Sequence, residues 1–168
     1  EAKSPRLAWA TDTLQDVNGV SRTIVSAATL ARRRSLPLTV LTSEIARPSH
    51  DFDCENFAPI WETPVPRYEE LTLRVPPVME LIEHCERERY GRLLISTPGP
   101  VGLAALAAGK LLGVPIAGIY HTDFPRYVGA LGGGDKLAAF AGSYLRWFYS
   151  QVDRVFVSSE SYRAELER

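Results

Sequence analysis

Three short segments carry the side chains that could do chemistry, and each follows an apolar run typical of a buried strand. The first runs from Asp12 to Gly19, the second from Ser96 to Gly102, and the third from Tyr120 to Tyr127. In α/β proteins, functional residues most often lie in the loops that directly follow the buried strands. Each segment could therefore bind a ligand or serve only the structure.

The segment from Asp12 to Gly19 suits a phosphate or a diphosphate. Asp12 is the first ionisable residue after the apolar run, and Asn18-Gly19 opens a helical pattern. A helix N-terminus offers unpaired N–H groups and the positive end of a dipole, and a glycine lets an anion approach them. An ordinary N-cap followed by a turn glycine explains the residues equally well. The three-glycine dinucleotide fingerprint is absent, which disfavours a nicotinamide-dependent dehydrogenase.

The segment from Ser96 to Gly102 predicts a tight turn into a helix, because Pro100 suits the first helical position. This helix start also favours an anion in principle. The many small residues that follow favour a helix that simply packs closely on a sheet. We retain Thr97, Pro98 and Gly99 as candidate cleft residues.

The segment from Tyr120 to Tyr127 gathers His, Asp, Arg and two Tyr in one loop. His121 can exchange a hydrogen bond or a proton with a sugar hydroxyl. A structural pairing of His121 with Asp123 is the alternative, and we favour the functional role because of the position at the strand end. Tyr127 is a further candidate for the cleft.

Strand and helix patterns alternate along the chain, and the resulting fold decides where these three segments lie. Strands are expected at Leu7–Thr11, Leu38–Thr42, Phe57–Trp61, Leu93–Ser96, Ile116–Tyr120 and Arg154–Val157, and helices at 20–31, 76–88, 100–113, 135–151 and 159–168. Apolar strands between helices predict a Rossmann-like α/β fold, a doubly wound parallel sheet in a three-layer α/β/α arrangement. The usual strand order, 3-2-1-4-5-6, brings all three segments to one edge of the sheet.

Composition excludes several classes of protein. The formal net charge of −1 over 168 residues argues against a nucleic-acid-binding surface. Cys54 and Cys85 lack metal-type spacing and the three histidines are scattered, so no metal is expected and a reduced, cytoplasmic chain is predicted. No apolar stretch is long enough to span a bilayer.

The aromatic helix around 136–149 allows two interpretations. Its aromatic and basic residues would suit a peripheral contact at the inner face of a membrane. We favour packing on the sheet, because amphipathic helices with one apolar side are common in globular domains. The expected buried side consists of Leu137, Phe140, Tyr144, Leu145 and Phe148.

Five segments in order resemble the N-terminal domain of retaining glycosyltransferases of family 4, which have the GT-B fold. They are Thr11–Thr13 with Val17–Thr23, Pro64–Pro76, Ser96–Gly102, Tyr120–Pro125 and Asp153–Ser159. The similarity is greatest to the branch that includes GDP-mannose-dependent α-mannosyltransferases acting on glycolipids and the sulfoquinovosyl diacylglycerol synthases. The resemblance implies that residues 1–168 form the acceptor-side half, and that a donor-binding C-terminal domain lies outside this sequence. The last predicted helix has no stop signal, which likewise indicates a piece of a longer protein.

The resemblance also implies roles for single residues. The loop of Asn18, Gly19 and Val20 would face the donor diphosphate. His121 would contact the transferred sugar near the reacting carbon. The acceptor would be contacted by Asp12, Tyr68 and Asp123. Around Tyr68 the chain reads Arg-Tyr-Glu where the family has a Tyr-Pro-Glu-like run, so the acceptor loop is expected to differ.

The expected reaction is hexosyl transfer from a GDP- or UDP-sugar to a lipid or saccharide acceptor, with no cofactor. The resemblance implies that the reaction needs no protein nucleophile, so positioning and electrostatic support of the leaving diphosphate would carry catalysis. Two enzyme alternatives stay open, a GT-B epimerase and a glycogen- or starch-type synthase. A non-enzymatic flavodoxin-like module is disfavoured, because a receiver needs an acidic cluster after its first strand and an Asp after its third.

Overall fold

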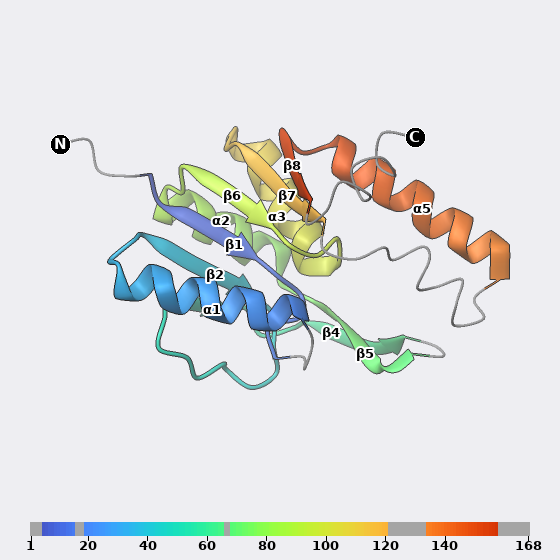
Figure 1. Cartoon of the computed structure of the whole chain (residues 1–168), viewed down its shortest axis with the longest axis horizontal. Helices are drawn as coiled ribbons and strands as arrows, with labels where there is room; N and C mark the ends of the chain where they lie inside the picture. The colour runs from blue at the N-terminus through green and yellow to red at the C-terminus, as the bar shows by residue number, and fades with distance from the viewer. Residues whose placement is uncertain (1–4, 16–18, 66–67, 121–133, 158–168) are drawn as a thin grey trace.

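A six-stranded parallel sheet forms the centre of the molecule, with strand order β3-β2-β1-β6-β7-β8. The computed structural model describes residues 5–15, 19–65, 68–120 and 134–157. The strands are β1 Leu7–Ala10, β2 Leu38–Thr42, β3 Cys54–Asn56, β6 Arg92–Ile95, β7 Ile116–Tyr120 and β8 Arg154–Val157. The predicted strand order is confirmed, and β1 lies between β2 and β6 at the point where the order reverses (Figure 1).

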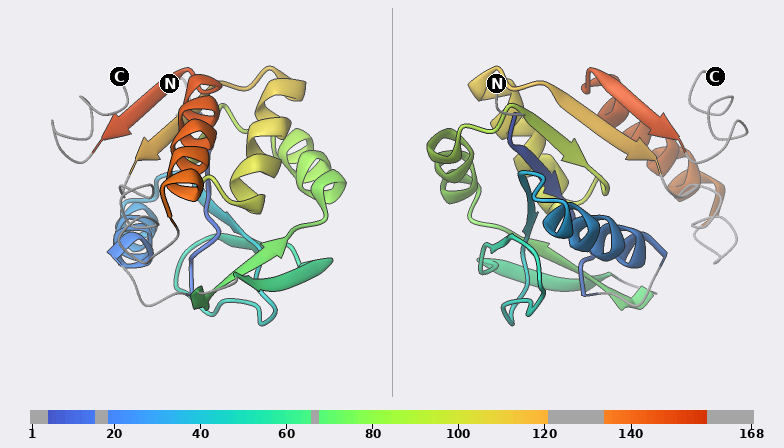
Figure 2. Two further views of the ribbon diagram at one scale, coloured as in Figure 1. Left: turned by 90° about the vertical axis from the view of Figure 1, so that its right-hand side faces the viewer. Right: turned by 60° about the vertical axis from the view of Figure 1, so that its left-hand side comes forward.

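Helices cover both faces of the sheet, as predicted. They are α1 Gly19–Arg33, α2 Val78–Glu88, α3 Pro100–Leu112 and α5 Gly134–Ser150. Helix α1 covers one face, and α2, α3 and α5 pack on the other (Figure 2). The helix predicted at 159–168 lies outside the described residues.

Helix α3 has the ends that its sequence signals predict. Pro100 is its first residue. Gly113, directly after its last turn, takes the left-handed conformation with φ of 66°. Proline at the start and glycine after the end are the usual markers of a helix.

Strand β1 shows how the sequence builds two cores. Ala8 and Ala10 join the cluster under α2, α3 and α5, and Trp9 between them joins the cluster under α1. Successive side chains of a strand alternate between faces, so a continuous apolar run fills both sides of a buried sheet. The Trp9 indole donates a hydrogen bond to Ser96 Oγ at 2.5 Å, which ties β1 to the end of β6.

The third strand of the sheet does not lie where the sequence predicts it. The edge strand next to β2 is Cys54–Asn56, not Phe57–Trp61. Phe57 follows β3 as a buried residue whose amide donates to the Thr42 carbonyl at 2.9 Å. Strand β3 is short and only half-buried, so it lacks the apolar run that predicts a strand.

An antiparallel hairpin, β4 Trp61–Val65 with β5 Tyr68–Val75, occupies the region of Tyr68, where the sequence predicts an acceptor loop. Its sequence is rich in charge and carries Pro64, which hides the alternation that predicts strands. The hairpin stands outside the six-stranded sheet, as Figure 1 shows.

Helix α5 packs on the sheet, as predicted, but one residue of the expected buried side lies outside. Phe140 is 70% exposed. The prediction is confirmed for Leu145 and Phe148, Tyr144 is half-buried, and the side chain of Leu137 lies outside the described residues. The observed buried side follows helical spacing. Its members are Ala141, Leu145, Phe148 and Tyr149.

The outer side of α5 also carries Trp147, which is half-exposed. Helix α5 therefore buries one aromatic side and leaves Phe140 and Trp147 on the other. Within the described part of the chain, no helix is both long enough and apolar enough to cross a membrane.

Candidate functional site

Asp12 lies at the carboxyl end of β1 and caps a helix that begins far away in the sequence. Its Oδ1 accepts a hydrogen bond from the Val101 amide at 2.7 Å, and its Oδ2 accepts from the Gly102 amide at 3.4 Å. Thr97 completes the arrangement, because its hydroxyl donates to Asp12 Oδ2 at 2.7 Å and accepts from the Asp12 amide at 2.8 Å. The carboxylate therefore satisfies N–H groups in the first turn of α3 that have no partner within the helix.

Gly99 makes room for this carboxylate. It is the N-cap of α3 and has no side chain with which to cap its own helix. A Cβ at Gly99 would lie 2.6 Å from Asp12 Cγ and Oδ2 and 2.8 Å from Oδ1. Its φ of −86° and ψ of −166° are open to any residue, so the requirement for glycine comes from the carboxylate alone.

Burial raises the pKa of Asp12 to about 6. Hydrogen bonds from Thr97 and from the amides of Val101, Gly102 and Gly99 act in the opposite direction, since they favour the charged form, but they do not offset the desolvation. The α3 terminus is thus occupied by a carboxyl group of the chain itself. The sequence predicted an anion-friendly helix start at this place, and the anion that fills it is Asp12.

Tyr144 of α5 joins the same cluster. Its hydroxyl donates to the Pro98 carbonyl at 2.5 Å, and the side chain is half-buried. Burial raises the pKa of Tyr144 to about 12, and the nearby charge of Asp12 acts in the same direction. Sequence reasoning placed Tyr144 in an apolar stripe and missed this contact, because only the packing of α5 over the Thr97–Gly99 turn reveals it.

The start of α1 differs from the start of α3. Helix α1 begins at Gly19, which is exposed, and a Cβ there would meet no atom within 4 Å. The first turn is fixed by Ser21, whose hydroxyl donates to the Leu14 carbonyl at 2.7 Å. Val20 packs its side chain against the core cluster under α1, which leaves its backbone as the part that could face a ligand.

Several predicted site residues lie outside the described residues. Asn18, His121, Asp123 and Tyr127 belong to this group. Tyr68 begins β5, and only its backbone is described. Of the remaining predicted residues, the structure brings together Asp12, Thr97, Pro98 and Gly99. It places Gly19 and Val20 at the start of α1, directly after the loop that leaves β1.

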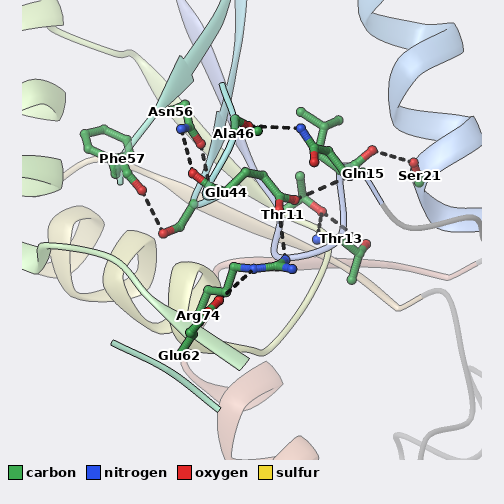
Figure 3. Close-up of polar contacts among 12 residues, drawn as sticks. Thr11, Thr13, Gln15, Ser21, Glu44, Ala46, Asn56, Phe57, Glu62 and Arg74 are labelled. Carbon is green, nitrogen blue, oxygen red and sulfur yellow. Dashed lines mark hydrogen bonds and ion pairs between the residues drawn. The ribbon is translucent and has the colours of Figure 1, made fainter. Parts of the chain in front are cut away.

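A second polar network was not predicted from the sequence. Glu44 follows β2 and is 1% exposed, and its Oε2 accepts a hydrogen bond from Arg74 Nη1 at 2.8 Å. Its Oε1 accepts from the Gln15 amide at 3.4 Å (Figure 3). No sequence spacing links these residues, since they come from three separate parts of the chain.

The described part of the chain offers no metal site. Among residues 5–15, 19–65, 68–120 and 134–157, no group of three His, Cys, Asp or Glu side chains is placed to hold a metal ion. Burial raises the pKa of each cysteine thiol, Cys54 and Cys85, to about 11. Neither thiol is therefore activated as a nucleophile at neutral pH.

A comparison with protein families matches most of the chain. Residues 17–168 match the model of the family described as Glycosyltransferase Family 4. No curated protein matches the chain.

Two solved structures share the fold. One is a putative UDP-N-acetylglucosamine 2-epimerase from Listeria monocytogenes, with a TM-score of 0.56 and 12% identity over 97% of this chain and 41% of that one. The other is the UDP-GlcNAc 2-epimerase from Methanocaldococcus jannaschii, with a TM-score of 0.52 and 10% identity over 97% of this chain and 42% of that one. The chain therefore spans about two fifths of the length of either structure.

Proposed function

Because the chain belongs to glycosyltransferase family 4, we propose that it forms the acceptor-side half of a retaining enzyme that transfers a sugar from a nucleotide-sugar donor to a lipid or saccharide acceptor. The donor-binding domain would be a second α/β domain beyond residues 1–168. In this proposal the substrates meet at the carboxyl edge of the sheet, where ligands of open α/β sheets bind.

The contrast between two helix starts carries the proposal. The first N–H groups of α3 are already bonded to the Asp12 carboxylate. The start of α1 is exposed at Gly19 and has open space where a side chain would be. A diphosphate is therefore expected at α1, where Asn18, Gly19 and Val20 would offer backbone N–H groups.

Asp12 would serve the acceptor side by holding the Thr97–Gly99 turn in place. His121 would contact the transferred sugar, and Asp123 and Tyr68 would contact the acceptor. The reaction would need no protein nucleophile, since the leaving diphosphate and the acceptor hydroxyl meet on one face of the sugar. Catalysis would then rest on positioning and on electrostatic support of the diphosphate.

A glycolipid acceptor and a GDP-mannose donor are the finer form of this proposal. Phe140 and Trp147 project from α5 with exposed fractions of 70% and 50%, and Arg146 on the same helix is exposed. Exposed aromatic side chains beside a cation suit the interface of an anionic membrane. Such a contact would bring a lipid-linked acceptor to the domain.

Binding of GDP and UDP to Gly19 variants tests the proposal. The experiment uses the longest form of the protein that its gene encodes. Gly19→Val is expected to weaken nucleoside-diphosphate binding at least about tenfold, because a β-branched side chain would cover the helix start. Gly19→Ala is the matched control for folding, and both variants should keep the melting temperature. Unchanged affinity in Gly19→Val would show that this loop is only a turn.

Sugar epimerisation is the second candidate function, because both solved structures described above are named as UDP-N-acetylglucosamine 2-epimerases, one of them as a putative one. Such a reaction needs no acceptor. Donor consumption that does not depend on an acceptor would favour it over transfer.

A further inference from the structure

Glu44 is a buried carboxylate held rigidly beside the loop that leads to α1. Its amide donates to Asn56 Oδ1 at 2.8 Å, and Asn56 Nδ2 donates to the Glu44 carbonyl at 2.9 Å. The neighbouring Ser43 hydroxyl donates to the Phe57 carbonyl at 2.8 Å. These bonds fix the backbone from which the carboxylate projects.

The two carboxylate oxygens of Glu44 face different parts of the molecule. Oε1 accepts the Gln15 amide, and Gln15 lies between β1 and α1. Oε2 accepts from Arg74, which lies in β5 of the hairpin. One side chain thus joins the connection between β1 and α1 to the hairpin, as Figure 3 shows.

Other contacts hold the same connection in place. Gln15 Nε2 donates to the Ala46 carbonyl at 3.1 Å, and the Leu14 carbonyl accepts from Ser21 of α1. The position of Leu14 and Gln15 is therefore set by the segment after β2 and by the first turn of α1.

The hairpin turns its charged face, not its apolar face, toward Glu44. Arg74 pairs across the hairpin with Glu62, whose Oε2 lies 3.7 Å from Arg74 Nε. Trp61 and Leu73, which belong to the opposite face, are 56% and 41% exposed. A two-stranded hairpin is marginally stable alone, so the ion pair between Arg74 and buried Glu44 is well placed to anchor it.

We propose that Arg74 and Glu44 are positioning residues that couple the hairpin to the donor loop, here the segment at residues 11–15 that leads from β1 toward α1. The inference rests on the proposed function, in which the hairpin carries the acceptor contact Tyr68 and the donor loop leads to the diphosphate site. Displacement of the hairpin would be transmitted through Glu44 to Gln15 and then to the start of α1.

Four variants of the longest encoded protein test the coupling. Arg74→Met removes the guanidinium and keeps the stem, and Arg74→Lys keeps a charge. Glu44→Gln with Arg74→Met removes both charges. Arg32→Met is the matched control, since the Arg32–Asp53 pair is exposed on both sides, at 62% and 57%.

Two measurements are made on each variant: amide hydrogen exchange of peptides covering residues 11–15, and steady-state KM and kcat for the donor. Arg74→Met is expected to speed amide exchange in these peptides. It should also raise the donor KM about tenfold, with a smaller change in kcat, which is the size of effect expected from energetic coupling between residues in contact. Arg74→Lys should recover part of the effect. The double variant should be less impaired than Arg74→Met, because the carboxylate charge that Arg74 balances is removed together with the guanidinium. Arg32→Met should match the wild type.

Unchanged exchange in residues 11–15 of Arg74→Met would overturn the coupling. Faster exchange with an unchanged donor KM would overturn its link to the donor site. A fall in kcat alone, in proportion to the folded fraction, would reduce Arg74 to a structural role. Wild-type protein that binds no nucleotide sugar would instead refute the proposed function, while the exchange data would still test the contact itself.

Discussion

Gly99→Ala should destabilise the fold through a single clash. The added Cβ would lie 2.6 Å from Asp12 Cγ, closer than real carbon contacts allow, so either the carboxylate or the turn must move. Movement of the carboxylate weakens its bonds to the start of α3, and loss of such a cap costs about 1–2 kcal/mol. Overpacking of a tight site adds about 1–3 kcal/mol.

The expected loss for Gly99→Ala is therefore about 2–5 kcal/mol, which corresponds to a fall in melting temperature of roughly 4–20 °C for a chain of this size. Urea and thermal unfolding measure the change. Gly19→Ala is the matched control and should be nearly neutral, since its Cβ meets no atom within 4 Å. Repeating Gly99→Ala in an Asp12→Ala background should remove most of the cost. An equal cost in both backgrounds would refute the role of the carboxylate.

The remaining predictions concern Asp12, Tyr144 and His121. Because the pKa of Asp12 is raised from 3.8 to about 6, the native state binds the proton more tightly than the unfolded state does. The free energy of unfolding should therefore fall, by at most about 3 kcal/mol, as the pH rises from about 4 to about 6. Unfolding measured across this pH range should show no such dependence in Asp12→Asn. Tyr144→Phe should cost about 1 kcal/mol in urea unfolding, because the bond to the Pro98 carbonyl is lost, and no change would make that contact irrelevant. His121→Ala should lower the rate of sugar transfer per folded molecule roughly 30- to 1000-fold, because the transition state would lose about 2–4 kcal/mol of stabilisation. A normal rate would remove His121 from the mechanism.

Most of the sheet could be predicted from sequence because its central strands are apolar runs between recognisable helices. The order β3-β2-β1-β6-β7-β8 is the usual order of a doubly wound sheet, and it places Asp12 beside Thr97. The position of α3 was equally predictable, since Pro100 and Gly113 mark its ends.

The contacts between distant residues could not be predicted. Asp12 caps α3 in place of a residue at the helix start itself, and no local pattern predicts a cap donated from another strand end. The Glu44–Arg74 pair joins the end of β2 to a hairpin whose charged face is turned inward, against the usual pattern. Short or charged strands such as β3 and β4 give too weak an alternation to be recognised.

Acceptor-dependent sugar transfer, followed by NMR, tests the proposed function most directly. The longest encoded protein is incubated with GDP- and UDP-sugars, with and without glycolipid or saccharide acceptors. A retaining transferase is expected to consume donor only when an acceptor is present, and to form a product whose anomeric configuration matches that of the donor. Appearance of a C2 epimer without acceptor, or a product of inverted configuration, would contradict the proposal.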